Sequence, residues 1–264
     1  MPPSPTRHRH QTIPSPLVQT VASLCRPPPT AKPSSFYDIP QTPICLRAEQ
    51  IIKEEIPDWA ANHCFRTYAF GLAIANYAGL DTEQAKVQFG FDKELHFLTC
   101  ALHEWGMSEE GIKQSKLSLE LWGAIRAREW ILEQKGSMSE TTTTKPLGEW
   151  ADLAAEAIAR HTIEFRGFSK TVNLQTALLT LGSGQDLMGL SSAFVHADDI
   201  KFICEKWPRI GYVDGLRDLT KEEVARKPGC LFEGCWGDFD PGMYHVSCFK
   251  GLQGSLTKNS SPRL

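Results

Sequence analysis

The chain contains 264 residues, of which 41% are hydrophobic and 22% are charged, and its formal net charge is −3. This length suffices for one large domain or two small ones. No run of eighteen apolar residues is present, which excludes a membrane-spanning helix, and the near-neutral charge offers no basic surface for nucleic acid. The eight cysteines include no C-x-x-C pair, which argues against a zinc ribbon or a disulfide scaffold. We therefore expect free thiols in a reducing compartment, and a cytoplasmic protein.

The N-terminal segment differs in composition from the rest of the chain. Eleven of the 17 prolines lie within residues 1–43. Because proline lacks a backbone N–H and fixes φ, we predict a disordered, proline-rich tail over residues 1–43. The alternative is a mitochondrial import peptide, since the segment carries Arg7, Arg9, Arg26 and Lys32 and no acidic residue before Asp38. Its proline density opposes the amphipathic helix that such a peptide needs.

From about residue 44 onward, the apolar residues follow helical spacing. The helices are expected, in chain order, over residues 62–77, 94–104, 115–134, 149–161, 173–181, 186–206 and 214–227. Gly79 and Gly106 lie where the first two are expected to end. Strand signals are few, so we predict an all-α bundle of seven or eight helices that forms one domain over residues 44–232. A polar, mobile loop is expected at 136–147 and an irregular C-terminal segment at 233–264.

Histidines are the main candidates for chemistry. His63, His103 and His161 fall on predicted helices, at positions expected to face inward or to end a buried turn. Glu104 directly follows His103, and imidazole and carboxylate groups in a helical bundle are common ligands of one divalent ion. Asp186 is a candidate second carboxylate. The other histidines of the folded region (His96, His196 and His245) are interpreted as structural, because no motif surrounds them.

Six short motifs occur in order and carry a resemblance to a known family. They are N-H-C-F-R at 62–66, L-T-C-A-L-H-E-W-G at 98–106, L-E-L-W-G-A at 119–124, A-I-A-R-H at 157–161, D-L-M-G at 186–189, and W-P-R-I-G-Y at 207–212 with K-P at 227–228. Together they resemble motifs of fungal cyanamide hydratases, a branch of the HD-domain superfamily. The resemblance covers about residues 44–232 and implies an HD-domain-like helical bundle.

The resemblance also implies a cofactor and a reaction. It implies a divalent metal, zinc before iron, with His63, His103, Glu104 and Asp186 as ligands and His161 beside them as a catalytic residue. In the family, water activated by the metal adds to the nitrile-like carbon of cyanamide and gives urea. The expected partner is therefore a small-molecule substrate, without nucleic acid or membrane, and the sequence leaves homo-oligomerisation open.

Two further residues are candidates within this picture. Arg66 lies one helical turn from His63 and is expected to orient a carboxylate ligand or the substrate through charge-assisted hydrogen bonds. Glu120 is expected either to accept a hydrogen bond from a ligating imidazole N–H or to be a surface glutamate, and the sequence leaves both interpretations open.

One departure from the family keeps other functions in consideration. The superfamily motif is His-Asp, whereas this chain has His103-Glu104, one methylene longer. The site is therefore expected to be retained with altered geometry, retuned for another nitrile-like or C–N substrate, or lost in a repurposed protein. An HD-type phosphohydrolase is a further alternative, although the arginines near the motifs (Arg66, Arg126, Arg128 and Arg160) form no clear phosphate-binding pocket. An ordinary helical domain without a site is the remaining interpretation.

Overall fold

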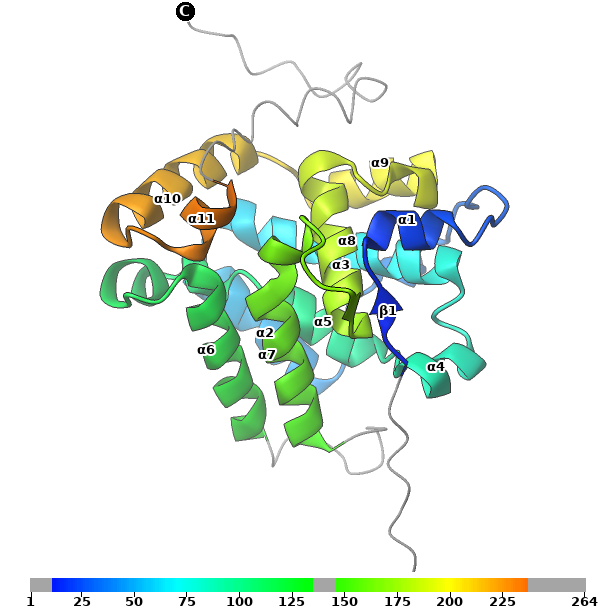
Figure 1. Ribbon diagram of the computed structural model, residues 1–264, viewed down its shortest axis with the longest axis horizontal. Helices are drawn as coiled ribbons and strands as arrows, with labels where there is room; N and C mark the ends of the chain where they lie inside the picture. Colours follow the sequence, from blue (N-terminus) through cyan, green and yellow to red (C-terminus); the bar gives the residue numbers. More distant parts are fainter. Residues whose placement is uncertain (1–10, 135–145, 237–264) are drawn as a thin grey trace, which may run out of the picture.

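The computed structural model describes residues 11–134 and 146–236, and these are predominantly helical (Figure 1). The longer helices are α2 (Pro43–Glu55), α3 (Asp58–Ala78), α5 (Lys93–Leu102), α6 (Leu119–Glu133), α7 (Leu147–Glu164), α8 (Leu174–Met188), α9 (Ala197–Lys206) and α10 (Tyr212–Arg226). The short ones are α1 (Leu17–Ala22), α4 (Glu83–Phe89) and α11 (Leu231–Trp236). The described strands β1 (Ile13–Pro14) and β2 (Thr171–Val172) form one small antiparallel pair. The prediction of an all-α bundle is confirmed.

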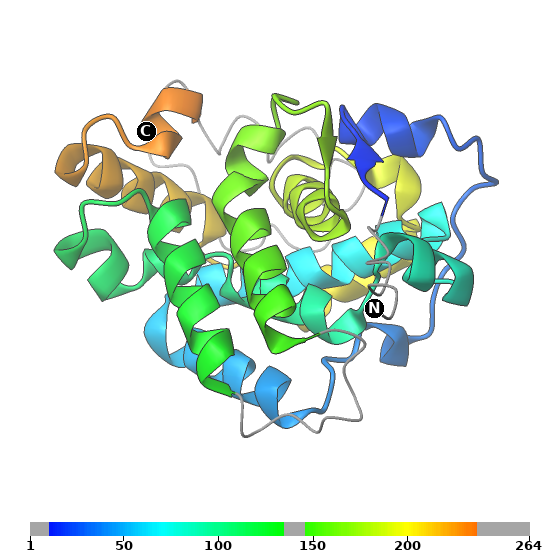
Figure 2. The same cartoon turned by 60° about the horizontal axis from the view of Figure 1, so that its bottom comes forward.

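The centre of the bundle is the contact between α3 and α8. Most of α3 is buried, which is the pattern of a helix surrounded by others rather than of a surface helix. Gly182 on α8 packs against the α3 backbone so closely that a β-carbon there would overlap the Thr67 carbonyl oxygen. This close approach brings the C-terminal half of α8 against the first turns of α3. Helices α6 and α7 lie side by side along the flank (Figures 1 and 2).

The expectation of a disordered tail over residues 1–43 is wrong for residues 11–43. Ile13 of β1 pairs with Val172 of β2, and α1 packs on α8 with Leu17 and Val21 buried. Helix α1 forms because the stretch between Pro16 and Pro27 is free of proline, so its N–H groups can all donate. Composition averaged over the segment concealed this gap. Residues 1–10 lie outside the described part of the chain.

Helix boundaries agree with the sequence where the apolar stripe is long. Helices α3 and α7 contain the predicted ranges 62–77 and 149–161, and Gly79 ends α3 in the left-handed conformation, at φ 71°. The ranges 173–181 and 186–206 are wrong, because α8 continues through Gly182 and Gly184 to Met188 and α9 begins only at Ala197. Most of the expected loop at 136–147 and of the C-terminal segment lies outside the described residues. Within the described ranges, no helix is both long and apolar enough for a membrane span.

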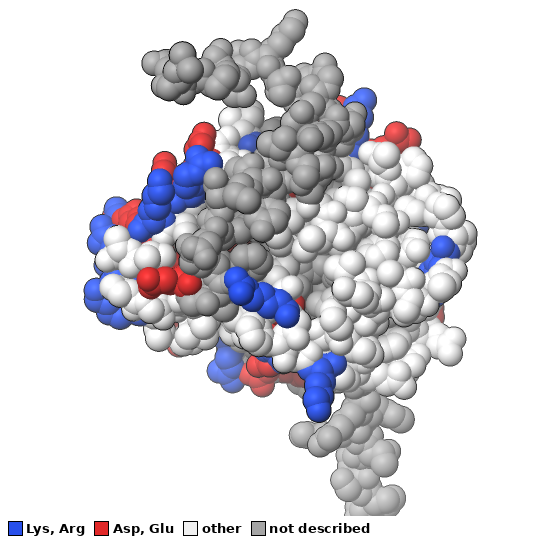
Figure 3. Space-filling view, turned by 45° about the horizontal axis from the view of Figure 1, so that its top comes forward, with Lys and Arg blue, Asp and Glu red and all other residues white. Residues whose placement is uncertain are grey.

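Charged side chains are mixed on the surface. On the face in Figure 3, basic and acidic groups alternate along one edge, and a wide neighbouring area carries few charges. Elsewhere among the described residues, charged side chains form ion pairs one helical turn apart, such as Arg226 with Glu222 and Lys113 with Glu109. Exposed pairs of this kind contribute little to stability.

Candidate metal centre

Three helices bring the three predicted histidines together. His63 lies in the second turn of α3, His103 directly follows α5, and His161 lies in the last turn of α7. The ring centroids of His63 and His103 are 5.1 Å apart, and those of His103 and His161 are 5.0 Å apart. All three rings are buried. The helical periodicity that placed these side chains on inward faces is therefore consistent with the structure.

Each of these rings is held through its Nδ1 atom. His63 Nδ1 lies 2.6 Å from Asp186 Oδ2. His103 Nδ1 lies 2.7 Å from the carbonyl oxygen of Cys100, and His161 Nδ1 lies 2.8 Å from that of Ile158. Because carbonyl and carboxylate oxygens only accept, Nδ1 carries the hydrogen in all three rings. In the neutral form of each ring the lone pair therefore resides on Nε2, the arrangement found in metal-binding histidines.

Glu104 completes a group of ligand atoms with His63 and His103. Its Oε1 lies 3.2 Å from His103 Nε2 and 3.7 Å from His63 Nε2, and suitable atoms of the three residues all lie within 4.8 Å of one another. Two ligands of a tetrahedral zinc ion at about 2.0–2.1 Å are themselves about 3.3 Å apart. His103 Nε2 and Glu104 Oε2 are buried without a hydrogen-bond partner. The spacing and the facing acceptors fit a divalent cation.

Electrostatics at this group also favour positive charge. Burial opposes ionisation of Glu104, but His103, followed by His161 and His63, outweighs it and lowers the pKa of Glu104 to about 2. Burial likewise opposes charge on His103, yet Cys64 and Glu104 raise its pKa well above the ordinary value. Glu104 is therefore ionised at physiological pH and pairs with a protonated His103, and a bound divalent cation would replace the proton on that ring.

The turn that carries Glu104 is fixed in place. Trp105 is fully buried, its Nε1 donates to Glu55 Oε2 at 2.7 Å, and its ring packs edge-on against Trp130. At the next position, a β-carbon on Gly106 would overlap the backbone carbonyl of Leu119, so only glycine fits. The turn is thus clamped against α6, and Glu104 reaches the histidines from a rigid support.

Asp186 does not join this group. Arg66 donates to both of its oxygens, from Nε at 2.7 Å and Nη2 at 2.9 Å, and Arg209 pairs with it as well. Burial raises the pKa of Asp186, but Arg209, Arg66 and His63 outweigh it and hold the pKa well below the usual range. At 2.6 Å, its contact with His63 Nδ1 is a hydrogen bond and is too short for two ligands of one ion. Asp186 therefore orients His63, and Arg66 in turn orients Asp186.

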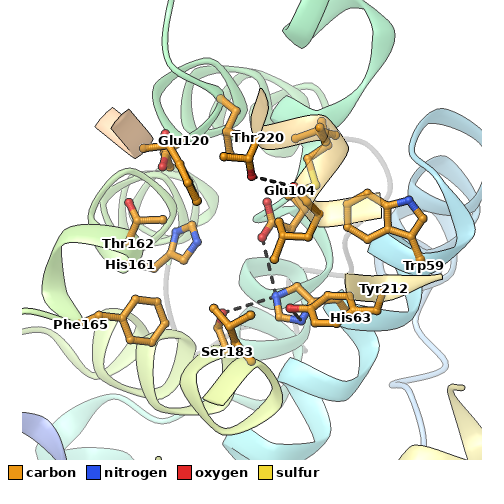
Figure 4. A pocket seen from close by; sticks show the side chains of 16 residues that line it. Trp59, His63, Glu104, Glu120, His161, Thr162, Phe165, Ser183, Tyr212 and Thr220 are labelled. Atoms are coloured by element: carbon orange, nitrogen blue, oxygen red, sulfur yellow. Dashed lines mark hydrogen bonds and ion pairs between the residues drawn. The ribbon is translucent and has the colours of Figure 1, made fainter. Parts of the chain in front are cut away.

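His63, His161 and Glu104 face a small, mostly apolar cavity of about 40 Å³ (Figure 4). Its polar lining residues are His63, Glu104, Glu120, His161, Thr162, Ser183 and Thr220. The remaining lining residues are Trp59, Met107, Leu119, Phe165, Leu187, Tyr212, Leu216, Leu219 and Phe232. Among these described lining residues there is no lysine, arginine, asparagine or glutamine. The cavity is therefore small and carries no basic side chain among its described lining residues.

Glu120 fits neither of its two expected descriptions. It is fully buried and lines the cavity, so it is not a surface glutamate. It also does not accept from a ligating imidazole, because the three Nδ1–H groups donate elsewhere. Burial, with contributions from Glu223 and Glu104, raises the pKa of Glu120 to about 7.

Some residues at the site were not singled out from the sequence. Ser183 Oγ lies 3.4 Å from His63 Nε2, and the Tyr212 hydroxyl lies 3.2 Å from His63 Nδ1. Ser183 precedes Asp186 by three positions, so helical spacing alone could have placed it on the same face. Tyr212 and Arg209 both belong to the W-P-R-I-G-Y motif, which was noted without a role for its side chains.

The histidines interpreted as structural lie away from the centre. His96 is buried, with Nε2 3.3 Å from the Tyr68 carbonyl oxygen. His196 caps α9, accepting from the Asp198 N–H through Nδ1 at 3.2 Å. His245 lies outside the described residues.

Comparison with known proteins relates the chain to one group of enzymes. It is 24% identical over 198 residues to the cyanamide hydratases DDI2 and DDI3 of Saccharomyces cerevisiae, an alignment that covers 75% of this chain and 80% of each relative. The chain is a distant homologue of cyanamide hydratases. No family model matches it. At this distance the homology supports a hydratase-like enzyme and leaves the substrate undetermined.

Proposed function

We propose that this chain is a metal-dependent hydratase that adds water to a small nitrile-like or C–N compound, with cyanamide to urea as the reference reaction. We also assign it to a divergent branch of the HD-domain superfamily. The observation that carries the proposal is the convergence of the His63 and His103 Nε2 atoms on Glu104, in a buried group whose facing acceptors fit a cation. Homology to cyanamide hydratases supports the reaction class.

His63, His103 and Glu104 would hold the ion, with zinc preferred over iron because two imidazoles and one carboxylate are a common catalytic zinc set. A bound divalent ion supplies two things at neutral pH: it lowers the pKa of water to about 7, and it polarises the cyano group. Asp186 was expected as a further ligand. We instead assign it, with Arg66, the task of fixing the tautomer and orientation of His63.

His161 is positioned to accept a proton. Burial, assisted by the neighbouring His103, lowers the pKa of His161 to about 4, so the ring is neutral at physiological pH. Its Nδ1–H is held by a backbone carbonyl, which leaves the Nε2 lone pair available at the cavity. General bases contribute about 10²–10⁴ to the rate, most when their pKa lies near the working pH, so the low pKa of His161 places its contribution at the small end of that range.

The phosphohydrolase alternative has little support. Phosphate binding needs arginine or lysine, and none lines the described cavity. Arg66 is engaged by Asp186, Arg126 lies over the Trp105 ring, and Arg128 and Arg160 pair with acidic residues on α7. A repurposed, inactive protein is the alternative that the experiment below separates.

The test is metal analysis of the purified protein together with urea release from cyanamide. We expect about one zinc per chain and urea formation, with both lost in His103→Gln. His196→Gln is the matched control, since His196 lies outside the site, and should retain both. Absence of both stoichiometric metal and urea would overturn the proposal, whereas bound metal without turnover of any small nitrile would identify a repurposed protein.

A further inference from the structure

A second cavity lies beneath the segment that joins α1 to α2. Residues 26–30 and Lys32 of this segment enclose it together with the C-terminal end of α3 and the start of α9. Its volume is about 190 Å³, against about 40 Å³ at the metal centre. Figure 2 shows the segment, in blue, along the edge of the molecule opposite α11, in orange. Because Tyr77 in its lining is about 21 Å along α3 from His63, the two cavities are separate.

The lining of this second cavity carries an excess of positive charge. The side chains of Arg26 and Lys32 form no ion pair or hydrogen bond with any other described residue. The guanidinium of Arg26 lies against the end of α3, where a β-carbon on Gly79 would be 2.6 Å from its Nη2 atom. Asp199 is the single acidic residue of the described lining, is buried, and accepts the Lys32 backbone N–H through Oδ1 at 3.0 Å. Two positive charges therefore face one negative charge, before any contribution from His196.

The apolar part of the same lining consists of rings. Tyr77 and Phe194 stack on each other, with ring centroids 5.3 Å apart and an interplanar angle of 23°. The prolines at 27–29 add three saturated rings and have no N–H to donate. The strongest donors that remain are the cationic groups of Arg26 and Lys32, since charged donors bind anions more strongly than neutral donors do. Cavities of about 150 Å³ hold one benzene ring, so this cavity has room for a ring and a charged group.

We propose that this cavity is a second ligand site, which binds a small monocarboxylate with a planar apolar group. The carboxylate pairs with Arg26 and Lys32, and the planar group packs on the proline rings and on the pair of Tyr77 and Phe194. A monoanion balances the net charge of +1, whereas a dianion such as a phosphate monoester exceeds it. None of these residues takes part in the proposed hydration, so the site is independent of the metal centre.

The test compares two probes that differ in charge. Benzoate and benzamide have the same ring and the same number of heavy atoms, but only benzoate is an anion. Titration calorimetry with the metal-loaded full-length protein measures both affinities. We expect the wild type to bind benzoate at least about tenfold more tightly than benzamide, from the charge-assisted hydrogen bonds. Acetate, which lacks the ring, should bind at least about tenfold more weakly than benzoate, because it buries less apolar surface.

Substitution of the two cations tests where benzoate binds. In the double variant Arg26→Gln/Lys32→Gln, the ratio of the benzoate and benzamide affinities should fall to within about threefold. Lys201→Gln is the matched control, because Lys201 is an exposed lysine of α9 that pairs with Glu205 outside the lining, and it should keep the wild-type ratio. An unchanged ratio in the folded double variant would overturn the proposal, as would equal affinities of the wild type for benzoate and benzamide.

The metal centre is the competing location for a carboxylate, since carboxylate oxygens also bind zinc. Removal of the metal with a chelator should leave the affinity for benzoate unchanged, because the second cavity is remote from His63. Benzoate binding that disappears with the metal but persists in the double variant would place the ligand at the metal centre and overturn the proposal.

Discussion

Shortening Glu104 by one methylene tests whether the centre is built for glutamate. In Glu104→Asp the carboxylate withdraws by about one C–C bond, roughly 1.5 Å. In the native chain, Glu104 Oε1 lies 3.2 Å from His103 Nε2 and 3.7 Å from His63 Nε2. Both distances are close to the spacing of about 3.3 Å between two ligands of one zinc ion. Aspartate at this position would leave the oxygen about 1.4 Å too far from His103 Nε2 and about 1.9 Å too far from His63 Nε2.

The backbone cannot move to compensate. Trp105 is buried and hydrogen-bonded to Glu55, and Gly106 abuts the Leu119 carbonyl, so the turn has no room to advance toward the histidines. A misplacement of about 1 Å in an active site costs on the order of 100-fold in rate. We therefore expect Glu104→Asp to lose about that factor in hydration of cyanamide and to retain less metal.

The assay is zinc content by mass spectrometry together with urea formation, in the wild type, Glu104→Asp and a control. Glu109→Asp is the control, because it removes the same methylene from an exposed glutamate five residues further along the chain. A large gain of activity in Glu104→Asp, with full metal content, would refute the reasoning. It would mean that the site is detuned by its longer carboxylate rather than adapted to it.

Three further outcomes follow from the structure. Asp186→Asn should lower the free energy of unfolding by about 3–5 kcal/mol, because two arginines lose a buried partner, and should weaken zinc affinity about 10–100-fold, as measured by guanidinium denaturation and metal titration. Gly182→Ala should lower the free energy of unfolding by about 1–3 kcal/mol, because the new β-carbon overlaps Thr67. Gly148→Ala is the control and should not lower it, because no atom lies within 4 Å of its new β-carbon. Equal stabilities of the two variants would contradict this packing argument. The pKa of Glu120 is raised to about 7, so folding favours its neutral form. Between pH 4.5 and 7, the free energy of unfolding of the metal-free wild type should therefore fall by about 3 kcal/mol relative to that of Glu120→Gln. A difference between the two proteins that does not change with pH would contradict the shift.

Local periodicity predicted the helices in which the same face is buried along the whole length. The stripe from Trp150 to His161 emerged as α7 because one face of that helix is buried. The range predicted for α8 ended too early, before Gly182 and Gly184, because glycine disfavours helix interiors. In the structure, Gly182 allows the α3 backbone to approach and Gly184 leaves room for the Phe165 side chain. The folded N-terminal segment was missed because its stability comes from contacts with β2 and α8, far away in sequence.

The site was predictable to the extent that its residues lie on regular helices. His63, His103 and His161 could be placed on inward faces from spacing alone, and the family motifs pointed to Glu104 and Asp186. The different roles of the Glu104 and Asp186 carboxylates could not be predicted. They depend on Arg209, which pairs with Asp186, and on the 2.6 Å contact between His63 of α3 and Asp186 of α8. The burial of Glu120 likewise depends on packing against α10, which no local pattern contains.

The pairing of β1 with β2 has a consequence for synthesis of the chain. Ile13 finds its partner only when Val172 has been made, about 160 residues later. At about 5–20 residues per second, the first strand and α1 wait on the order of ten to thirty seconds outside the ribosome without their binding surface. The prolines that flank this proline-free stretch suit that interval, because they interrupt the row of backbone N–H groups that could pair with other nascent chains.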